Sequence, residues 1–453
     1  MLRSFLAILA AAIVLALGVI GCSTRQIKPT LPAVNVRTAT MNITPGVEVL
    51  TRVALPDGFV PSPDYPPMWL QSGQEVAVIG SQNGRAVVMG YGGSGYRSAR
   101  VIAQDGGIGA PNGKLIDFAA NPDGMVLALA VVKADPARLD VVTRDVISAG
   151  AANPVSSFDG DFDSASIGWL GDFTIGLALR AHTADEPPRD RLGIMPVPQP
   201  PSGASSGLYT INVSGAVTTG YLKLNCKMSR LSWSPDGFVA IGSGDANAPP
   251  IIVDRGKESC VRLNAKAPVR VLDWQHDSKA FLFEEFGGPQ GTGAYRYDLE
   301  NMRARLVAIS SGAAAFVGND QALALGSAGL TFRAARSAPD APIRAEVALS
   351  NPNGSETEVE SLGFDTTPAM LAASTMTYAR ATDAAAIATF SPSPAGPIRK
   401  LVIYSVAPKR KFLVAYGPPR GAIAMSWSPR GRYLAIADGD VTAAALTIMM
   451  PPR

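Results

Sequence analysis

The stretch from Leu231 to Gly237 reads LSWSPDG, and it decides the fold that we expect for this chain. Pro235 presets φ for the first corner of a tight turn, the Asp236 side chain can bond its own backbone, and Gly237 supplies the positive φ that a Cβ resists. The apolar run 238–241 follows directly. This pattern predicts a strand, a tight turn and a second strand antiparallel to the first.

The same unit recurs along the chain. Residues 425–431 read MSWSPRG, and residues 117–124 read DFAANPDG. Weaker copies keep an aromatic residue, then turn residues, then an apolar strand. The eight aromatic anchors are Trp69, Phe118, Trp169, Trp233, Trp274, Phe316, Tyr378 and Trp427. Their mean spacing is about 51 residues, which with four short strands per unit is typical of a β-propeller.

We therefore expect an all-β fold: a β-propeller of eight blades, each a four-stranded antiparallel sheet. Seven blades follow if the copy at Phe316 or Tyr378 is spurious, and two or more separate β-sandwiches are the alternative fold. Two strands remain after the last anchor, so an N-terminal strand, from 34–37 or from 47–50, is expected to complete the last blade and close the ring. Insertions are expected near 186–207 and 340–365, as loops on one face.

The repeat resembles a known family. The SWSPDG and SWSPRG turns look like the repeat of TolB-type β-propellers (a WD40-like repeat), which occurs in many periplasmic proteins and in non-catalytic domains of some peptidases. Arg430 stands where the family has Asp, which leaves that turn less self-bonded. A lipid-anchored eight-bladed ring is also similar to BamB-type outer-membrane assembly lipoproteins, but in overall plan only.

A lipid anchor is predicted at the start of the chain. Arg3 precedes the apolar run 5–20, and residues 19–22 read VIGC. This arrangement resembles the lipobox of bacterial lipoproteins, which implies that Cys22 carries the lipid. Residues 1–21 are then a signal peptide, 22–33 a tether and 34–453 a single propeller domain. The alternatives are an uncleaved anchor, for which the run is short, and a signal cut elsewhere.

The residue after Cys22 is Ser23, not Asp. By resemblance to lipoprotein sorting rules, this favours the outer membrane, facing the periplasm, over the inner membrane. Cys226 and Cys260 are left as an even pair in an oxidising compartment. A disulfide between them is one interpretation and two separate buried thiols are the other.

Charge and titratable groups limit the functions that the chain can have. The formal net charge is +3 on 77 charged residues, so the sequence provides no basic field for nucleic acid. His182 and His276, the two histidines, are both expected in solvated loops. Residues 203–207 match G-x-S-x-G, but prolines precede them and a strand follows, so the context of a nucleophile elbow fails. No cofactor is predicted.

Three acidic side chains alternate with other residues at Asp159, Asp161 and Asp163. Calcium loops place ligands in this way, but the glycine and the bidentate glutamate of an EF-hand are missing here. We interpret the segment as a solvated acidic turn, with calcium binding as the alternative. The run 356–360 alternates Glu with small residues and is expected on an exposed edge strand, or else as an electrostatic docking strip.

The favoured function is a non-enzymatic scaffold: a lipid-anchored envelope propeller that binds one or more partner proteins, with docking on the face that bears the 186–207 insertion. The second hypothesis is a propeller hydrolase or lactonase with a metal in the central channel. For it, Asp117 and Asp273 are candidates, although bonds to the neighbouring blade's backbone explain them better. The third hypothesis is recognition of a glycan or another small ligand by a loop face.

Overall fold

The structure is a computed structural model that divides into two units, Met1–Val34 and Asn35–Arg453. It describes the following residues of the second unit: 41–147, 152–181, 207–214, 217–223, 231–237, 239–242, 250–257, 259–263, 265, 269–288, 291–309, 312–318, 320–326, 340–419 and 421–452. The predicted signal peptide and tether lie outside these residues. Within them, no helix is long and apolar enough to cross a membrane.

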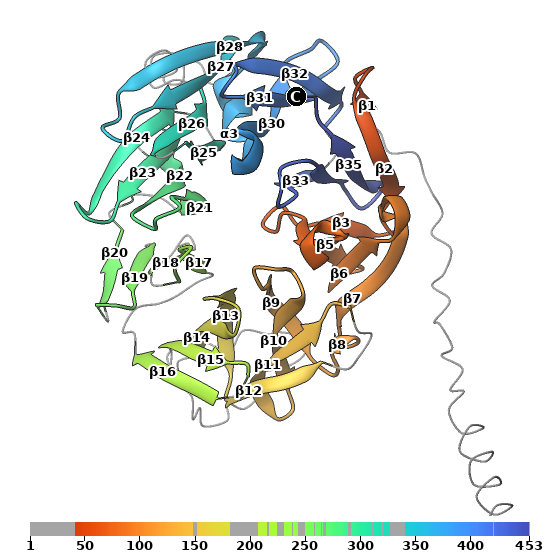
Figure 1. Cartoon of the computed structure of the whole chain (residues 1–453), viewed down its shortest axis with the longest axis vertical. Coiled ribbons are helices and arrows are strands. Elements are labelled where there is room, and N and C mark those ends of the chain that lie inside the picture. Colours follow the sequence, from red (N-terminus) through yellow and green to blue (C-terminus); the bar gives the residue numbers. More distant parts are fainter. Residues whose placement is uncertain are drawn as a thin grey trace, which may run out of the picture. The chain divides into compact units, whose positions relative to one another are not determined.

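Eight small sheets stand around a central axis, so the predicted eight-bladed β-propeller is confirmed (Figure 1). Blade 1 contains β3 (Phe59–Pro61), β4 (Met68–Leu70), β5 (Glu75–Gln82), β6 (Arg85–Gly92), β7 (Ser98–Asp105) and β8 (Gly109–Ala110), and blade 2 contains β9 (Lys114–Ala120), β10 (Val126–Ala134), β11 (Ala137–Asp145) and β12 (Asn153–Asp159). Blade 3 contains β13 (Phe162–Trp169), β14 (Thr174–Ala181), β15 (Gly207–Asn212) and β16 (Val217–Lys223). Blade 4 contains β17 (Leu231–Trp233), β18 (Val239–Gly242), β19 (Ile251–Asp254) and β20 (Ser259–Arg262).

Blades 5 to 8 follow in the same order around the ring. Blade 5 contains β21 (Val269–Trp274), β22 (Ala280–Gly288), β23 (Gly291–Asp298) and β24 (Arg303–Ile309), and blade 6 contains β25 (Ala314–Val317), β26 (Gln321–Leu325), β27 (Ile343–Ser350) and β28 (Glu356–Thr366). Blade 7 contains β29 (Thr375–Ala379), β30 (Ala384–Ser391), β31 (Ile398–Ser405) and β32 (Arg410–Gly417). Blade 8 contains β33 (Ala422–Trp427), β34 (Leu434–Gly439) and β35 (Ala444–Met450). The short helices are η1 (Gln71–Gly73), η2 (Ser94–Tyr96), α3 (Pro368–Ala372) and η3 (Arg380–Thr382).

An N-terminal strand closes the ring. β2 (Glu48–Ala54) pairs antiparallel with β35 and becomes the fourth strand of blade 8. Of the two predicted closing segments, 47–50 therefore overlaps the strand that completes the blade. β1 (Asn42–Ile43) adds a fifth strand to blade 7 by pairing with β32. Both ends of the described chain are thus fixed in sheets, and β2 covers the outer edge of β35.

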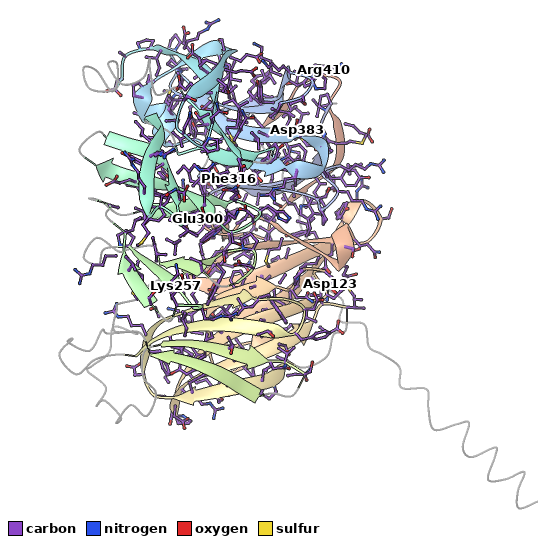
Figure 2. The ribbon with its side chains drawn as sticks, turned by 60° about the vertical axis from the view of Figure 1, so that its left-hand side comes forward. Asp123, Lys257, Glu300, Phe316, Asp383 and Arg410 are labelled. Atoms are coloured by element: carbon purple, nitrogen blue, oxygen red, sulfur yellow. The ribbon has the colours of Figure 1, made fainter. Side chains whose placement is uncertain are left out.

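Strand direction gives the ring two distinct faces. The hairpins between first and second strands, such as 234–237, and those between third and fourth strands lie on one face, which we call the turn face. Asp123, Lys257, Glu300 and Asp383 belong to hairpins on this face (Figure 2). The links between successive blades and the hairpins between second and third strands lie on the other face, which we call the link face. Ala181 and Gly207, which flank the 182–206 segment, therefore lie at the link face.

Apolar side chains fill the interfaces between blades. Each of the eight buried clusters found among the described residues draws its members from two adjacent sheets, so each interface has its own core. Blades 1 and 8, for example, share a cluster that includes Phe59, Tyr91 and Leu446. Because apolar burial is spread around the ring, each blade is stabilised by its two neighbours.

One predicted insertion is wrong. Residues 340–365 contain β27 and most of β28, which are the third and fourth strands of blade 6. The segment looked like a polar loop because β28 is the outermost strand of its sheet, so several of its side chains face solvent. Its pattern nevertheless supports the expected edge strand at 356–360. The long connection in this blade is instead 326–342, between β26 and β27.

Candidate functional site

The eight anchor aromatics all lie on the innermost strands of their blades. Four of the tryptophans donate an indole N–H to the preceding blade: Trp169 to the carbonyl of Ala119 at 2.9 Å, Trp427 to that of Thr377 at 3.1 Å, Trp274 to Ser232 Oγ at 2.9 Å and Trp69 to the carbonyl of Ser426 at 3.4 Å. In Trp233, by contrast, the buried indole N–H has no partner among the described residues. These side chains combine apolar packing with a directional bond between blades.

Asp117 and Asp273 fasten one blade to the next. The backbone N–H of Ile167 in blade 3 donates to Asp117 Oδ2 at 2.8 Å, and that of Phe316 in blade 6 donates to Asp273 Oδ2 at 2.8 Å. Burial raises the pKa of Asp273 to about 6, while the N–H groups of Phe316 and Trp274 and the charge of Arg380 act in the opposite direction. Both aspartates thus bind the backbone of the neighbouring blade, which is the interpretation that the sequence favoured over a role in a metal-dependent hydrolase.

A loop splits the innermost strand of blade 1. Residues 62–67, which read SPDYPP, separate β3 from β4, and both of these strands pair with β5. The hydroxyl of Tyr65 donates to Asp117 Oδ1 at 2.7 Å, and the Tyr65 ring lies 4.4 Å from the ring of Phe118. Pro63, Asp64 and Pro66 line the central channel. The loop therefore forms part of the channel wall.

A cavity of about 660 Å³ occupies the link-face end of the central channel. Its walls come from the loop 62–67 and from the beginnings of the innermost strands of blades 4 to 8. These strands contribute Leu231, Val271, Ala314, Met376 and Met425. The volume lies in the range of small-molecule sites, and the lining combines aliphatic residues with polar ones such as Ser232, Thr375 and Thr377.

Arg270 and Asp64 are the charged side chains of this lining among the described residues. Asp64 is exposed on the loop. Arg270 stands directly opposite Glu284 in the β21–β22 pairing, and its Nη2 donates to Glu284 Oε2 at 2.7 Å. The Arg270 side chain is 40% exposed, whereas that of Glu284 is 0% exposed. The guanidinium thus faces the channel and the carboxyl lies behind it.

The pair is electrostatically unusual. Burial raises the pKa of Glu284 to about 7, although Arg270 lowers it through its charge and its hydrogen bond. Glu284 Oε1 and Arg270 Nε are buried without a hydrogen-bond partner among the described residues. A Cβ at Gly312 would lie 2.8 Å from Glu284 Oε1, so a glycine there leaves room for the carboxyl. Such perturbed groups beside a cavity mark candidate functional sites.

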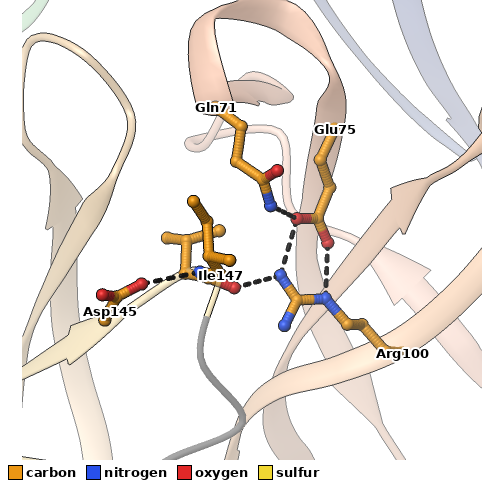
Figure 3. Close-up of polar contacts among 6 residues, drawn as sticks. Gln71, Glu75, Arg100, Asp145 and Ile147 are labelled. Carbon is orange, nitrogen blue, oxygen red and sulfur yellow. Dashed lines mark hydrogen bonds and ion pairs between the residues drawn. The ribbon is translucent and has the colours of Figure 1, made fainter.

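A second pocket of about 760 Å³ lies on the turn face of blade 1. Arg100 donates to both carboxylate oxygens of Glu75, at 2.8 and 2.6 Å, and to the carbonyl of Val146 in blade 2, while Gln71 donates to Glu75 Oε2 at 2.8 Å (Figure 3). A Cβ at Gly90 would lie 2.1 Å from Glu75 Oε1. Gly90 thus makes room for a carboxylate that connects blades 1 and 2 through Arg100.

The acidic run in β28 is partly paired across a blade boundary. Lys409 Nζ lies 2.7 Å from Glu358 Oε2, and the Tyr404 hydroxyl donates to Glu360 at 3.1 Å. Lys411 Nζ lies 3.7 Å from Glu360 Oε1. The glutamates of blade 6 therefore contact blade 7 along the outer rim.

The remaining predicted site residues fall mostly outside the described part of the chain. Cys22, Cys226 and His182 are among them, as are residues 203–206 of the G-x-S-x-G match. Cys260, in β20, is disulfide-bonded. Its pairing with Cys226 stays a prediction, because neither of the other two cysteines is among the described residues.

The calcium candidates lie where β12 passes into β13. Asp159 ends β12, Asp161 lies in the link, and Asp163 is in β13 with its side chain outside the description. Among the described residues, no group of three His, Cys, Asp or Glu side chains is arranged to hold a metal. Calcium binding here stays untested.

Sequence reasoning missed Arg270, Glu284 and the loop 62–67. A signal for the pair was present, because both residues flank the predicted turn after Trp274 at nearly equal distances. An antiparallel hairpin pairs such positions. The proline-rich stretch 61–67 was also visible, but nothing local showed that it interrupts an innermost strand.

No protein-family model and no curated protein matches the chain. Among solved structures it is similar to dihydro-heme d1 dehydrogenase NirN in complex with DHE, with a TM-score of 0.50 and 13% identity over 88% of this chain and 78% of that chain. The comparison with oligogalacturonate lyase in complex with manganese gives a TM-score of 0.46 and 11% sequence identity, and it covers 92% of this chain and 98% of the lyase. The comparison with a prolyl endopeptidase gives a TM-score of 0.44 and 14% sequence identity, and it covers 87% of this chain and 55% of the endopeptidase. At these identities the likeness shows the propeller fold alone.

Proposed function

We propose that the chain is a lipid-anchored protein of the bacterial cell envelope that acts as a non-enzymatic interaction module. The anchor is Cys22, the membrane is the outer membrane on its periplasmic side, and the partner is another envelope protein. The TolB-type resemblance of the SWSPDG and SWSPRG turns belongs to this proposal, since proteins with such repeats are frequent in the periplasm.

One observation supports the docking face most directly. The two longest connections within blades, 182–206 and 326–342, leave their strands at the link face, where the channel cavity also opens. Loops on a rigid scaffold are the usual place for recognition. The link face is therefore the side on which we place the partner.

The ring itself suits a scaffold. Its closure through β2 and β35 joins the two ends of the described chain, and the carboxylates of Asp117 and Asp273 bind backbone N–H groups of adjacent blades. A closed ring of this kind presents a fixed surface, so a partner can dock with little ordering cost.

Photo-crosslinking in native envelopes tests the docking face. The crosslinker replaces Val441, which is 65% exposed in the β34–β35 hairpin of the link face, or Met302, which is 56% exposed on the turn face. We expect a reproducible protein adduct from position 441 and none from 302. Adducts from 302 alone would contradict the link-face assignment, and no reproducible adduct from either position would overturn the interaction module.

The anchor has a separate test. Labelled fatty acid fed to growing cells should appear in the full-length protein and disappear in the Cys22→Ser variant. Density fractionation of the same cells should recover the labelled protein with the outer membrane. Label retained in Cys22→Ser would overturn the assignment of the lipid to this cysteine.

A further inference from the structure

The two charged side chains in the described lining of the channel cavity belong to opposite walls. Asp64 comes from the loop 62–67 of blade 1, and Arg270 comes from β21 of blade 5. In a ring of eight blades, blade 5 lies across the axis from blade 1, and Figure 1 shows β3 and β21 on opposite sides of the centre. The cavity therefore has one negative wall and one positive wall.

Both charges are accessible from the cavity. Asp64 is exposed, and it makes no hydrogen bond or ion pair within the part of the chain that the structure describes. Arg270 uses Nη2 for its bond to Glu284, yet its side chain stays 40% exposed. A ligand in the cavity can therefore contact a carboxylate on one side and a guanidinium on the other.

The wall between the two charges is rich in hydrogen-bonding groups. It includes the hydroxyl-bearing residues Ser232, Thr375 and Thr377. The innermost strands that contribute to it are also terminal strands of their sheets: β17, β21, β25, β29 and β33. A terminal strand leaves part of its backbone N–H and C=O groups unpaired along its free edge, which here is the channel side. Such a wall suits a small polar ligand.

A buried carboxyl behind Arg270 determines how much of its charge is available. Opposite Glu284, β21 presents Arg270 and β23 presents Ala294, while the link between β24 and β25 presents Gly312. Arg270 is thus the charged group that these elements bring to Glu284, whose side chain is 0% exposed. Ionised Glu284 neutralises Arg270, whereas protonated Glu284 leaves the guanidinium its full charge for an anionic group in the cavity.

We propose that the cavity at the link-face end of the channel binds a small zwitterion of the ω-amino acid type, with its carboxylate on Arg270 and its ammonium group at Asp64. The fork of a guanidinium matches a planar carboxylate, and a carboxylate accepts charge-assisted hydrogen bonds from an ammonium group. The site is independent of the docking proposal, because it concerns a small ligand inside the ring.

Titration calorimetry of the full-length protein at pH 6 tests the site with a matched set of ligands. Glycine, γ-aminobutyrate and ε-aminocaproate differ in the distance between their ammonium and carboxylate groups, and we expect saturable binding of at least one. Its two singly charged forms should bind about tenfold or more weakly, because each lacks one charge-assisted bond. For γ-aminobutyrate these forms are butyrate and γ-aminobutyramide.

Two variants assign the charges of the ligand to the walls. Asp64→Asn should bind the zwitterion no more tightly than it binds the form without the ammonium group. Asp172→Asn is the control, because Asp172 lies in an exposed turn of blade 3 outside the lining, and it should bind as wild type does. The double variant Arg270→Gln with Glu284→Gln leaves no lone buried charge, and it should lose the preference for the zwitterion over its amide.

The carboxyl behind Arg270 adds a pH signature. With the pKa of Glu284 at about 7, its protonated form is the majority at pH 6 and about one molecule in eleven at pH 8. The affinity of wild type for the zwitterion should therefore fall about tenfold from pH 6 to pH 8, since both charges of an ω-amino acid persist over this range. Glu284→Gln should show no such fall.

The outcomes are distinct. No saturable binding of any of these zwitterions, equal affinity for a zwitterion and its singly charged forms, or unchanged binding by Asp64→Asn would each overturn the proposal. Thermal unfolding of each variant shows whether it is folded. If the variants of Arg270 and Glu284 do not fold, the pH profile of wild type decides: a tenfold fall supports the site, and a flat profile contradicts it.

Discussion

The carboxylate of Asp117 in blade 2 accepts a hydrogen bond from the backbone N–H of Ile167 in blade 3, with 2.8 Å between Oδ2 and N. Asp117 precedes the anchor Phe118 by one residue, and Asp273 precedes Trp274 in the same way and binds the N–H of Phe316. The same residue position is thus used twice to connect successive innermost strands. In both blades, carboxylates close to the axis contribute to the ring's cohesion.

Replacing Asp117 should destabilise the ring. Asp117→Ala leaves the N–H of Ile167 and the hydroxyl of Tyr65 without their acceptor, and an unsatisfied buried donor costs about 1–3 kcal/mol. We expect a lower urea midpoint for this variant. Asp172→Ala, in an exposed turn of blade 3, is the control and should unfold with wild type. Equal midpoints for Asp117→Ala and the control would show that the carboxylate does not hold the blades together.

The tryptophan anchors allow a matched comparison. Trp169→Phe removes an indole N–H that donates to the carbonyl of Ala119, whereas Trp233→Phe removes a buried N–H without a described partner. Both changes lose similar volume. The hydrogen-bonded indole should therefore cost about 1 kcal/mol more to replace, and chemical unfolding of the two variants measures the difference. The reverse order of stability would contradict the bonding role given to the indoles.

The blade pattern could be predicted because its determinants are local. The residues of the turn at 234–237 select a tight hairpin by their own φ preferences, and Gly237 indeed has a φ of +70°. An aromatic anchor followed by such a turn repeats often enough to count the blades. Closure by an N-terminal strand, from 34–37 or from 47–50, followed from the two strands left after Trp427.

The channel site could not be predicted to the same extent. The pairing of Arg270 with Glu284 depends on a register shift between Val271 and Asp273, and the loop 62–67 interrupts a strand that the sequence pattern treats as continuous. The register shift is a local irregularity of the β21–β22 hairpin, whereas the loop 62–67 is held by a contact between distant segments, that of Tyr65 with Asp117. The polar β28 was mistaken for part of an insertion because an outermost strand exposes its side chains as a loop does.

Stability should fall as the pH rises through 6. Burial raises the pKa of Asp438 to about 6, against the opposing charges of Arg399 and Arg52. Because the folded pKa lies above the ordinary value of 3.8, the protonated form is favoured by folding, and its contribution is complete below about pH 4 and lost above pH 6. For this group the loss is on the order of 2–3 kcal/mol. The Asp438→Asn variant should lack the contribution of this group to the pH dependence of stability.

Urea midpoints at pH 5 and pH 8 measure this effect. Wild type should lose more stability between these values than Asp438→Asn does. Asp365→Asn is the control, because Asp365 is 56% exposed beside Arg344 and should leave the wild-type pH dependence unchanged. A pH dependence in Asp438→Asn as steep as that of wild type would assign the effect to other groups.

The ion pair between Glu358 and Lys409 should contribute to the contact of blades 6 and 7 only slightly. The two side chains are 46% and 50% exposed at 2.7 Å, so water and salt screen their attraction, and the expected contribution is about 0.5 kcal/mol. Glu358→Lys or Lys409→Glu alone should lower the urea midpoint by placing like charges together, and the double reversal should restore it. The differences should vanish in about 1 M salt, where the screening length is about 3 Å. If the double reversal stays as unstable as the single variants, the two side chains do not interact as a pair.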